Sequence, residues 1–411
     1  MVGNKGGVAV SFLFNSTHLA FVCSHLAARA ERKVKRNQMY HDISRQLNIG
    51  RKSKLASFDL PYRFDHVFWV GDLNYRLDCE YREVLSRSEG RDFAGLLQYD
   101  QLGAERARGH VFYGYREGQI SFPPSYRYRR GSRDQYIYIK YKKTGNVFNV
   151  PSYCDRILTH SLPNLASRQT GYFCNLLYTA SDHAPVIATY QIGTRSLCVP
   201  VRSVAADTLL ESSLQVRLPI VQARIKSVSQ DRFYLKFFSV LFEGIPCSKP
   251  APRLLAEYSD DLGGFPDEAS LAKCDISFWA GSDLPVLEPI LPNRSYLANE
   301  NVHVQVLAHG SEECYGQGII TLREIANADE PYPFRLLLTL GDEVCGEIRG
   351  RACLSRSPQS RALFSDQLCK PEWSRAANKD GINSSRAANK DGVNSSRAST
   401  SSDQDIGGAV I

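Results

Sequence analysis

The stretch FWVGDLNYRLD, residues 68–78, runs from apolar residues directly into Gly71, Asp72, Leu73 and Asn74. Its pattern predicts a buried strand that ends on a carboxylate and a carboxamide, with a glycine that permits a tight backbone. PSYCDRIL at residues 151–158 and SDHAP at residues 181–185 each place an aspartate beside a cation or an imidazole, next to an apolar run. Three such fragments in this order indicate metal-assisted phosphate chemistry.

Length and composition restrict the class of protein. A chain of 411 residues exceeds the size at which single cores stop growing, so we expect two domains. Eleven cysteines without a CxxC pair favour reduced thiols in a cytoplasmic protein over disulfides or a zinc site. No apolar run has the length of a signal sequence or a membrane span.

The positive charge is concentrated in one loop. Residues 124–143 hold seven basic side chains against the single acid Asp134, and tyrosines are interleaved with them. The partner of this loop should be anionic: phosphate groups, a membrane surface or nucleic acid. A solvated surface without a partner is the alternative. The basic residues are Arg127, Arg129, Arg130, Arg133, Lys140, Lys142 and Lys143.

The hydrophobic pattern divides the chain into three parts. Residues 1–193 alternate short strands and helices, which predicts α/β layers. The expected strands are 8–14, 19–23, 67–70, 157–159, 172–178 and 185–191, and the expected helix is 30–47. Residues 194–353 predict a β-sandwich with strands at 214–228, 232–241, 275–278, 301–307, 318–322 and 334–340. Residues 354–411, with the repeats SRAANKDGINS and SRAANKDGVNS, predict a disordered tail.

Taken alone, each polar residue at these strand ends could have either a catalytic role or a purely structural one. Asp72 and Asn74 could hold or activate a water, and Asp155 could orient the imidazole of His183. Oxygen ligands of this kind suit Mg²⁺. Conversely, Asp72 could be a turn residue, and Asp155 with the adjacent arginine could be a structural ion pair. His25, a second imidazole after a strand, could be a satisfied structural residue.

Seven fragments together resemble the inositol polyphosphate 5-phosphatase family over residues 2–192: GNKGGVAVSF, SHLAA, RNQMY, FWVGDLNYRLD, FPPSYRY, PSYCDRIL and SDHAPV. ISFPPSYRYRRGSRDQY is most similar to the SH-two-containing inositol 5-phosphatases. RFYLKFFS, LPVLEPIL and CYGQGIITL resemble the C-two-type β-sandwich that follows their catalytic domain. The resemblance implies an α/β fold, the DNase I-like (endonuclease/exonuclease/phosphatase) sandwich. It also implies Mg²⁺-dependent removal of the 5-phosphate of phosphatidylinositol 3,4,5-trisphosphate at the inner face of the plasma membrane.

The resemblance also implies roles for individual residues. Asp72 would activate the attacking water, which Asn74 would position together with the phosphate. His183, oriented by Asp155, would bind the scissile phosphate, and His25 would be the second imidazole beside it. Further residues would lie beside the metal (Asp182), bind phosphate or brace the rim (Asn37 and Arg156), and grip neighbouring ring phosphates (Tyr126 and Arg127 with Lys142 or Lys143).

The sequence differs from the family's usual pattern in two places that bear on these expectations. The family's domain normally begins well before GNKGG, and that earlier part carries an asparagine and the main glutamate ligand of the metal. We therefore expect an incomplete catalytic domain with an open sheet edge and low activity. Tyr153 also stands where the family usually has tryptophan.

Two other functions remain open: a non-catalytic phosphoinositide-binding adaptor, and a nuclease of the same superfamily. The FPPSYRYRRGSRDQY insertion argues against the nuclease, so no nucleic acid partner is expected. Signalling adaptor proteins are candidate partners, and nothing in the sequence points to an obligate oligomer.

Overall fold

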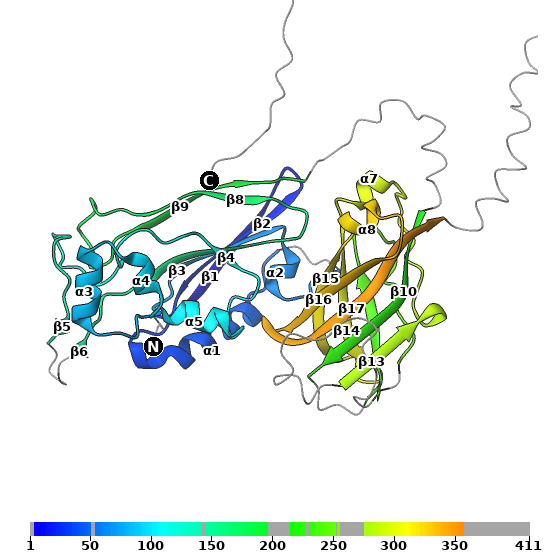
Figure 1. Cartoon of the computed structure of the whole chain (residues 1–411), viewed down its shortest axis with the longest axis horizontal. Coiled ribbons are helices and arrows are strands. Elements are labelled where there is room, and N and C mark those ends of the chain that lie inside the picture. The colour runs from blue at the N-terminus through cyan, green and yellow to red at the C-terminus, as the bar shows by residue number, and fades with distance from the viewer. Residues whose placement is uncertain are drawn as a thin grey trace, which may run out of the picture.

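The computed structural model describes residues 4–50, 54–141, 145, 147–195, 214–226, 231–251, 253–254 and 275–356. These residues form two units, 4–195 and 214–356, which lie side by side in Figure 1. Lys142, Lys143 and the repeats of the predicted tail lie outside the described residues. Within the described residues, no helix is both long enough and apolar enough to cross a membrane.

The first unit contains short strands and helices in alternation, as predicted. Its strands are β1 (Gly6–Phe14), β2 (Thr17–His25), β3 (His66–Asp72), β4 (Arg116–Glu117), β5 (Ile139–Lys140), β6 (Val147–Phe148), β7 (Asp155–Ser161), β8 (Ser167–Cys174) and β9 (Val186–Ile192). Its helices are the 3-10 turn η1 (Ala30–Arg32), α1 (Lys33–Gln46), α2 (Leu60–Arg63), α3 (Tyr81–Glu89), α4 (Phe93–Leu97) and α5 (Gln101–Ala107).

The first unit is built on a five-stranded sheet with the strand order β1-β2-β3-β7-β4. The predicted hairpin is confirmed: β1 and β2 pair antiparallel around Asn15 and Ser16, both of which have positive φ. β3 runs parallel to β2 and antiparallel to β7. One face of the sheet is covered by α1, whose Tyr40 packs against Trp69 of β3 with ring centroids 4.9 Å apart.

The opposite face of this sheet is only partly covered. The β8–β9 hairpin lies over β3, where Tyr190 packs against Phe68 in a small cluster. On β1, however, Val8 and Val10 are 72% and 58% exposed, and among the described residues β1 pairs with β2 alone. An apolar edge strand of this kind favours association with other chains.

The second unit is the predicted β-sandwich. Its strands follow the order β11-β14-β15-β16-β17-β10-β13-β12, and a single residue pair, Gln317 with Thr339, joins β15 to β16. The ladder therefore divides there into two layers around one core that includes Phe233, Trp279 and Val304. The elements are β10 (Leu214–Ile225), β11 (Phe233–Phe238), β12 (Arg253–Leu254), β13 (Asp275–Ala280), η2 (Gly281–Asp283), α7 (Arg294–Leu297), β14 (Asn301–Ala308), β15 (Cys314–Thr321), α8 (Arg323–Asn327), β16 (Tyr332–Leu340) and β17 (Glu343–Arg356).

The strand β17 was not predicted, and it extends past the expected domain end at residue 353. Glycines and charges interrupt its apolar pattern. Gly346 is required by packing, because a Cβ there would lie 2.3 Å from the carbonyl oxygen of Arg224 on β10. Glu347 and Arg349 are buried and hydrogen-bonded to each other, so their charges do not prevent burial.

Polar contacts join the two units. The turn between β16 and β17 reaches α1, where the Tyr40 hydroxyl donates to Asp342 Oδ2 at 3.2 Å and Ser44 donates to the same oxygen. At the other side of the junction, Arg195 lies 2.8 Å from Asp65 and 3.0 Å from Glu300. Residues of both units are therefore buried against each other.

Candidate active site

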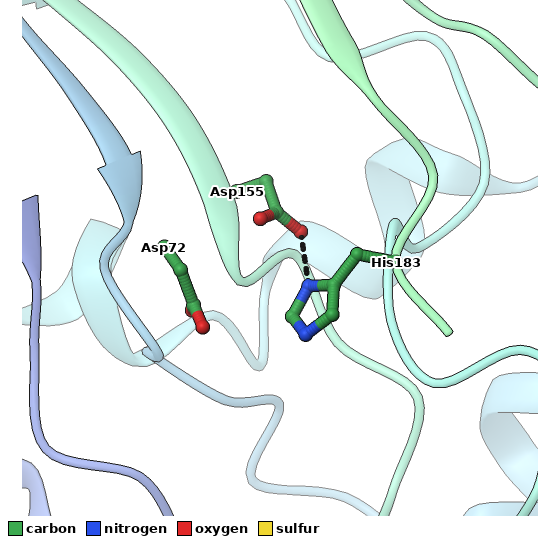
Figure 2. Close-up of side chains that lie close together, drawn as sticks. All are labelled: Asp72, Asp155 and His183. Atoms are coloured by element: carbon green, nitrogen blue, oxygen red, sulfur yellow. Dashed lines mark hydrogen bonds and ion pairs between the residues drawn. The ribbon is translucent and has the colours of Figure 1, made fainter. Parts of the chain in front are cut away.

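Three neighbouring strands bring acidic and imidazole side chains to one end of the sheet. The register pairs His25 at the end of β2 with Asp72 at the end of β3, and Asp72 with Asp155 at the start of β7. His183 comes from the segment between β8 and β9, and its Nδ1 lies 2.8 Å from Asp155 Oδ2 (Figure 2). The structure therefore brings together four of the five residues that were predicted to be catalytic.

The backbone around Asp72 requires the residues found there. Gly71 has φ +129°, and a Cβ at this position would lie 2.1 Å from the carbonyl oxygen of Ser24 on β2. Only glycine allows β2 and β3 to approach so closely. Asn74 adopts φ +57°, which turns the chain away from the strand direction.

Asp72, Asp155 and His183 form a group that fits a divalent cation. The ligand atoms of these three side chains all lie within 4.8 Å of one another. Two carboxylates provide the oxygen donors that Mg²⁺ prefers, and each side chain is partly exposed. Figure 2 shows the carboxylate of Asp72 facing the space beside the imidazole of His183.

Burial and neighbouring charges set the protonation of the cluster. Burial raises the pKa of the Asp72 carboxyl, and the charge of Asp155 raises it further. Burial alone would lower the pKa of His183, but its hydrogen bond to Asp155 and the charge of that carboxylate raise it overall. Asp72 is thus suited to accept a proton, and His183 to keep one.

His25 and Lys5 complete the charged side of the site. His25 Nε2 lies 3.1 Å from Asp72 Oδ2, and the Lys5 ammonium contacts the same imidazole nitrogen. Burial lowers the pKa of His25 and of Lys5. Lys5 was missed in the sequence, although it lies in the quoted GNKGG segment directly before the first strand.

Comparison with known proteins matches both units. Residues 1–189 match the family model described as Endonuclease/Exonuclease/phosphatase family 2, and residues 230–351 match the SHIP1/2 second C2 domain. Phosphatidylinositol 3,4,5-trisphosphate 5-phosphatase 1 of Xenopus laevis is 36% identical over 359 residues, 87% of this chain and 34% of that protein. Phosphatidylinositol 3,4,5-trisphosphate 5-phosphatase 2A of Danio rerio is 37% identical over 90% of this chain and 28% of its own length.

The chain belongs to the inositol polyphosphate 5-phosphatase family.

This family member spans about a third of the length of the curated relatives it matches. A solved inositol polyphosphate 5-phosphatase domain of a synaptojanin, in complex with inositol (1,4)-bisphosphate and a calcium ion, is 34% identical. The match covers 46% of this chain and 51% of that one, with a TM-score of 0.39.

Asn74, the fifth predicted catalytic residue of this 5-phosphatase family member, contacts the cluster through its backbone. Its N–H donates to Asp72 Oδ1 at 3.1 Å. Its carboxamide is buried, donating to the Leu26 carbonyl at 3.2 Å and accepting from the Arg76 guanidinium at 2.6 Å. Arg76 was not predicted to belong to the site, although it lies in the DLNYR segment. Its guanidinium fixes the orientation of the Asn74 side chain.

Tyr126 and Arg127, predicted to grip ring phosphates, lie beside the cluster, and Asp182, predicted to lie beside the metal, is not among the three described residues whose ligand atoms converge. The Tyr126 ring lies against His183 with centroids 4.4 Å apart. Arg127 Nε lies 3.3 Å from one Asp182 oxygen, and Arg130 lies 3.5 Å from the other. Asp182 is therefore held by two arginines, whose attraction contributes to the lowered pKa of its carboxyl although burial opposes it.

Arg156 and Asn37 brace the site rather than face it. Arg156 is buried and pairs with Asp100 at 2.9 Å and Glu117 at 2.7 Å, so its charge is neutralised inside the protein. The Asn37 carboxamide donates to Glu105 at 2.7 Å and accepts from the Tyr75 hydroxyl at 2.8 Å. Of the two roles predicted for these residues, the contacts fit bracing and leave no group of Arg156 for a phosphate.

Proposed function

We propose that this chain is a Mg²⁺-dependent phosphoinositide 5-phosphatase acting on phosphatidylinositol 3,4,5-trisphosphate. The named relatives support the substrate class, because they are phosphatidylinositol 3,4,5-trisphosphate 5-phosphatases. The observation that carries the proposal is the convergence of Asp72, Asp155 and His183, whose ligand atoms lie within 4.8 Å. A nuclease is less well supported, since the two named relatives carry phosphatase names.

The residues of the cluster would divide the chemistry among them. Asp72 would take the proton of the attacking water, because its raised pKa makes it a better base near neutral pH. His183, held by Asp155 at 2.8 Å, would donate to a phosphate oxygen. A bound Mg²⁺, held beside the carboxylates of Asp72 and Asp155, would neutralise phosphate charge. Lys5 would add a fixed positive charge beside His25.

The membrane contact that we propose lies in the chain segment that follows the rim residues Tyr126 and Arg127. Arg129, Arg130 and Lys140 are exposed cations of this segment. Exposed aromatic residues of the β5–β6 region accompany them, namely Tyr141 and Phe148. Exposed cations attract anionic lipid, and exposed aromatic rings favour the headgroup region. This composition supports recruitment to an anionic membrane such as the inner face of the plasma membrane.

Phosphate release from vesicles containing phosphatidylinositol 3,4,5-trisphosphate tests the proposal. With Mg²⁺ present, we expect His183→Ala to lower the rate by about 100-fold or more, while vesicle binding changes by less than about twofold. His309→Ala, which removes an exposed imidazole of the second unit, is the matched control. Equal rates for both variants would refute the assignment. Vesicle binding without release by the unaltered chain would favour the adaptor function, and cleavage of DNA would favour the nuclease.

A further inference from the structure

The β8–β9 hairpin has a polar end and an apolar end. Just before β8, Asn164 bonds to Asn301 of the second unit. Along the first part of the hairpin the exposed side chains bond across the strands, as Arg168 does to Gln191 and Thr170 to Thr189. Farther from the second unit the side chains become apolar. We call this end the apolar tip, and it consists of Phe173, Leu176, Leu177, Tyr178 and Ile187.

The described residues leave the apolar tip uncovered. Leu177 is 94% exposed, and Leu176 and Tyr178 beside it are 39% and 51% exposed. Phe173 and Ile187, which are partners in the register of the two strands, are 47% and 37% exposed. Single apolar side chains on a surface are ordinary, but five in one hairpin end form a patch. A patch of this kind marks an interaction surface.

Hydrogen bonds fix the backbone of the apolar tip. The N–H of Asn175 donates to the Pro185 carbonyl at 2.7 Å, which closes the loop at its base. The Asn175 side chain accepts from the N–H of Leu177 at 3.0 Å, so the turn is stabilised from within. The guanidinium of Arg133 donates to the Tyr178 carbonyl from outside the hairpin. The exposure of these apolar side chains is therefore held in place by the fold.

Arg133 also connects the apolar tip to the candidate active site. The guanidinium that holds Tyr178 donates to the carbonyl oxygens of Ser181 and His183, each at 3.0 Å. It lies over the ring of Tyr128 at 4.8 Å from the centroid. One side chain thus fixes both the tip and the segment that carries the imidazole of the site. A surface that contacts the tip would lie close to the proposed catalytic cluster.

Positive charge lies beside the apolar tip. The N–H of Gly131 donates to the Thr179 carbonyl at 2.8 Å, which places the basic segment next to the loop. Arg129 is exposed in that segment, and the side chain of Arg130 is 75% exposed. The one acid of residues 164–195 is Asp182, and Arg130 lies 3.5 Å from it. Apolar side chains flanked by exposed arginines match a surface that is apolar beneath an anionic layer.

We propose that the apolar tip inserts into the headgroup region of an anionic phospholipid bilayer. Leu176 and Leu177 would leave water, Tyr178 would lie at the headgroups, and the adjacent arginines would contact lipid phosphates. The inference deepens the proposed membrane recruitment and rests on it, but it assigns the apolar anchor to a different element from the β5–β6 region. Insertion would hold His183 at the bilayer surface, where a lipid headgroup can reach it.

Binding of the whole chain to vesicles of phosphatidylserine and phosphatidylcholine, without any phosphoinositide, tests the anchor. We expect Leu177→Ser to weaken binding about tenfold, because a leucine side chain no longer leaves water. Leu177→Phe should bind at least as well as the unaltered chain. Val34→Ser is the matched control: Val34 is 76% exposed on α1, which covers the other face of the sheet, and binding should change less than about twofold.

A tryptophan at the same position reports insertion directly. We expect brominated lipid to quench the emission of Leu177→Trp, while Val34→Trp should show no more quenching than the unaltered chain. Equal vesicle binding by Leu177→Ser and Val34→Ser, or equal quenching of the two tryptophan variants, would overturn the proposal. Loss of self-association in light scattering with unchanged vesicle binding would also overturn it, and would assign the tip to contact between copies of the chain.

The anchor and the catalytic function can fail separately, because neither vesicle readout requires turnover. Leu177-dependent binding by a chain that releases no phosphate would support the anchor and refute the catalytic function. Phosphate release by a chain whose vesicle binding does not depend on Leu177 would refute the anchor alone. The urea midpoint of Leu177→Ser should match that of the unaltered chain, since Leu177 is 94% exposed.

Discussion

Replacing Asp342 by asparagine should make the protein more stable at alkaline pH. Asp342 is buried at the junction of the units, where its backbone N–H donates to Asp59 at 3.0 Å. Burial, followed by the charge of Asp59, raises the pKa of Asp342 from 3.8 to about 7. At about 1.4 kcal/mol per tenfold change in a proton equilibrium, this difference corresponds to about 4 kcal/mol. The positive charge of Arg45 lowers the pKa of Asp342, and the value of about 7 already contains this contribution.

The raised pKa of Asp342 makes the free energy of unfolding depend on pH. Because the folded-state pKa lies above the unfolded value, the folded chain keeps a proton that the unfolded chain loses between about pH 4 and pH 7. The free energy of unfolding should therefore fall across this window and level off above pH 7. Asparagine cannot ionise, yet it can still accept from Tyr40 and Ser44. Asp342→Asn should thus be close to neutral at pH 5 and stabilising by up to about 4 kcal/mol at pH 8.

Urea unfolding at pH 5, 6, 7 and 8 measures this difference directly. Asp329→Asn, at an exposed acid of the same unit, is the matched control and should show no comparable change with pH. An equal loss of unfolding free energy at pH 5 and pH 8 on Asp342→Asn would contradict this prediction. That outcome would mean that the carboxylate of Asp342 is stabilised in its charged form.

Three further substitutions test the packing of the site and the sheet. Gly71→Ala should lower the free energy of unfolding by about 3 kcal/mol or more, because its Cβ would lie 2.1 Å from the Ser24 oxygen; urea unfolding measures it. Arg156→Met should cost about 3–5 kcal/mol in the same assay, since it leaves the buried Asp100 without that cation and Glu117 with the more distant Arg106, at 3.5 Å. Val10→Lys should reduce concentration-dependent self-association in light scattering without lowering stability, because Val10 is exposed on the edge strand β1.

Each of these substitutions has a control of the same type. Gly109 also has positive φ, but a Cβ there would point into open space with no described atom within 4 Å, so Gly109→Ala should cost only about 1 kcal/mol. Arg82→Met removes an exposed arginine, and Val34→Lys alters an exposed valine on a helix. If any control changes its assay as much as its partner does, the specific contact invoked for that partner is not the cause.

Much of the fold could be read from periodicity, but the packing between distant segments could not. The hairpin of β1 and β2 and most strands of the sandwich follow from local alternation of apolar residues. β17 was not predicted because glycines and charges interrupt its apolar pattern, and the burial of Glu347 depends on an ion pair with Arg335 of the neighbouring strand β16. The burial of Asp342 against α1 likewise depends on how the two units meet. Sequence alone gives such residues the appearance of surface positions.

The candidate site shows where local rules would have been enough. Asp155 and Arg156 are consecutive residues of β7, and successive side chains of a strand point to opposite faces. They therefore could not both face one phosphate, and strand alternation alone would have assigned Arg156 to the interior. Strand alternation does not predict the orientation of Asn74, because Asn74 lies beyond the end of β3 and has φ +57°. Its orientation depends on the buried guanidinium of Arg76, which only the folded structure places beside it.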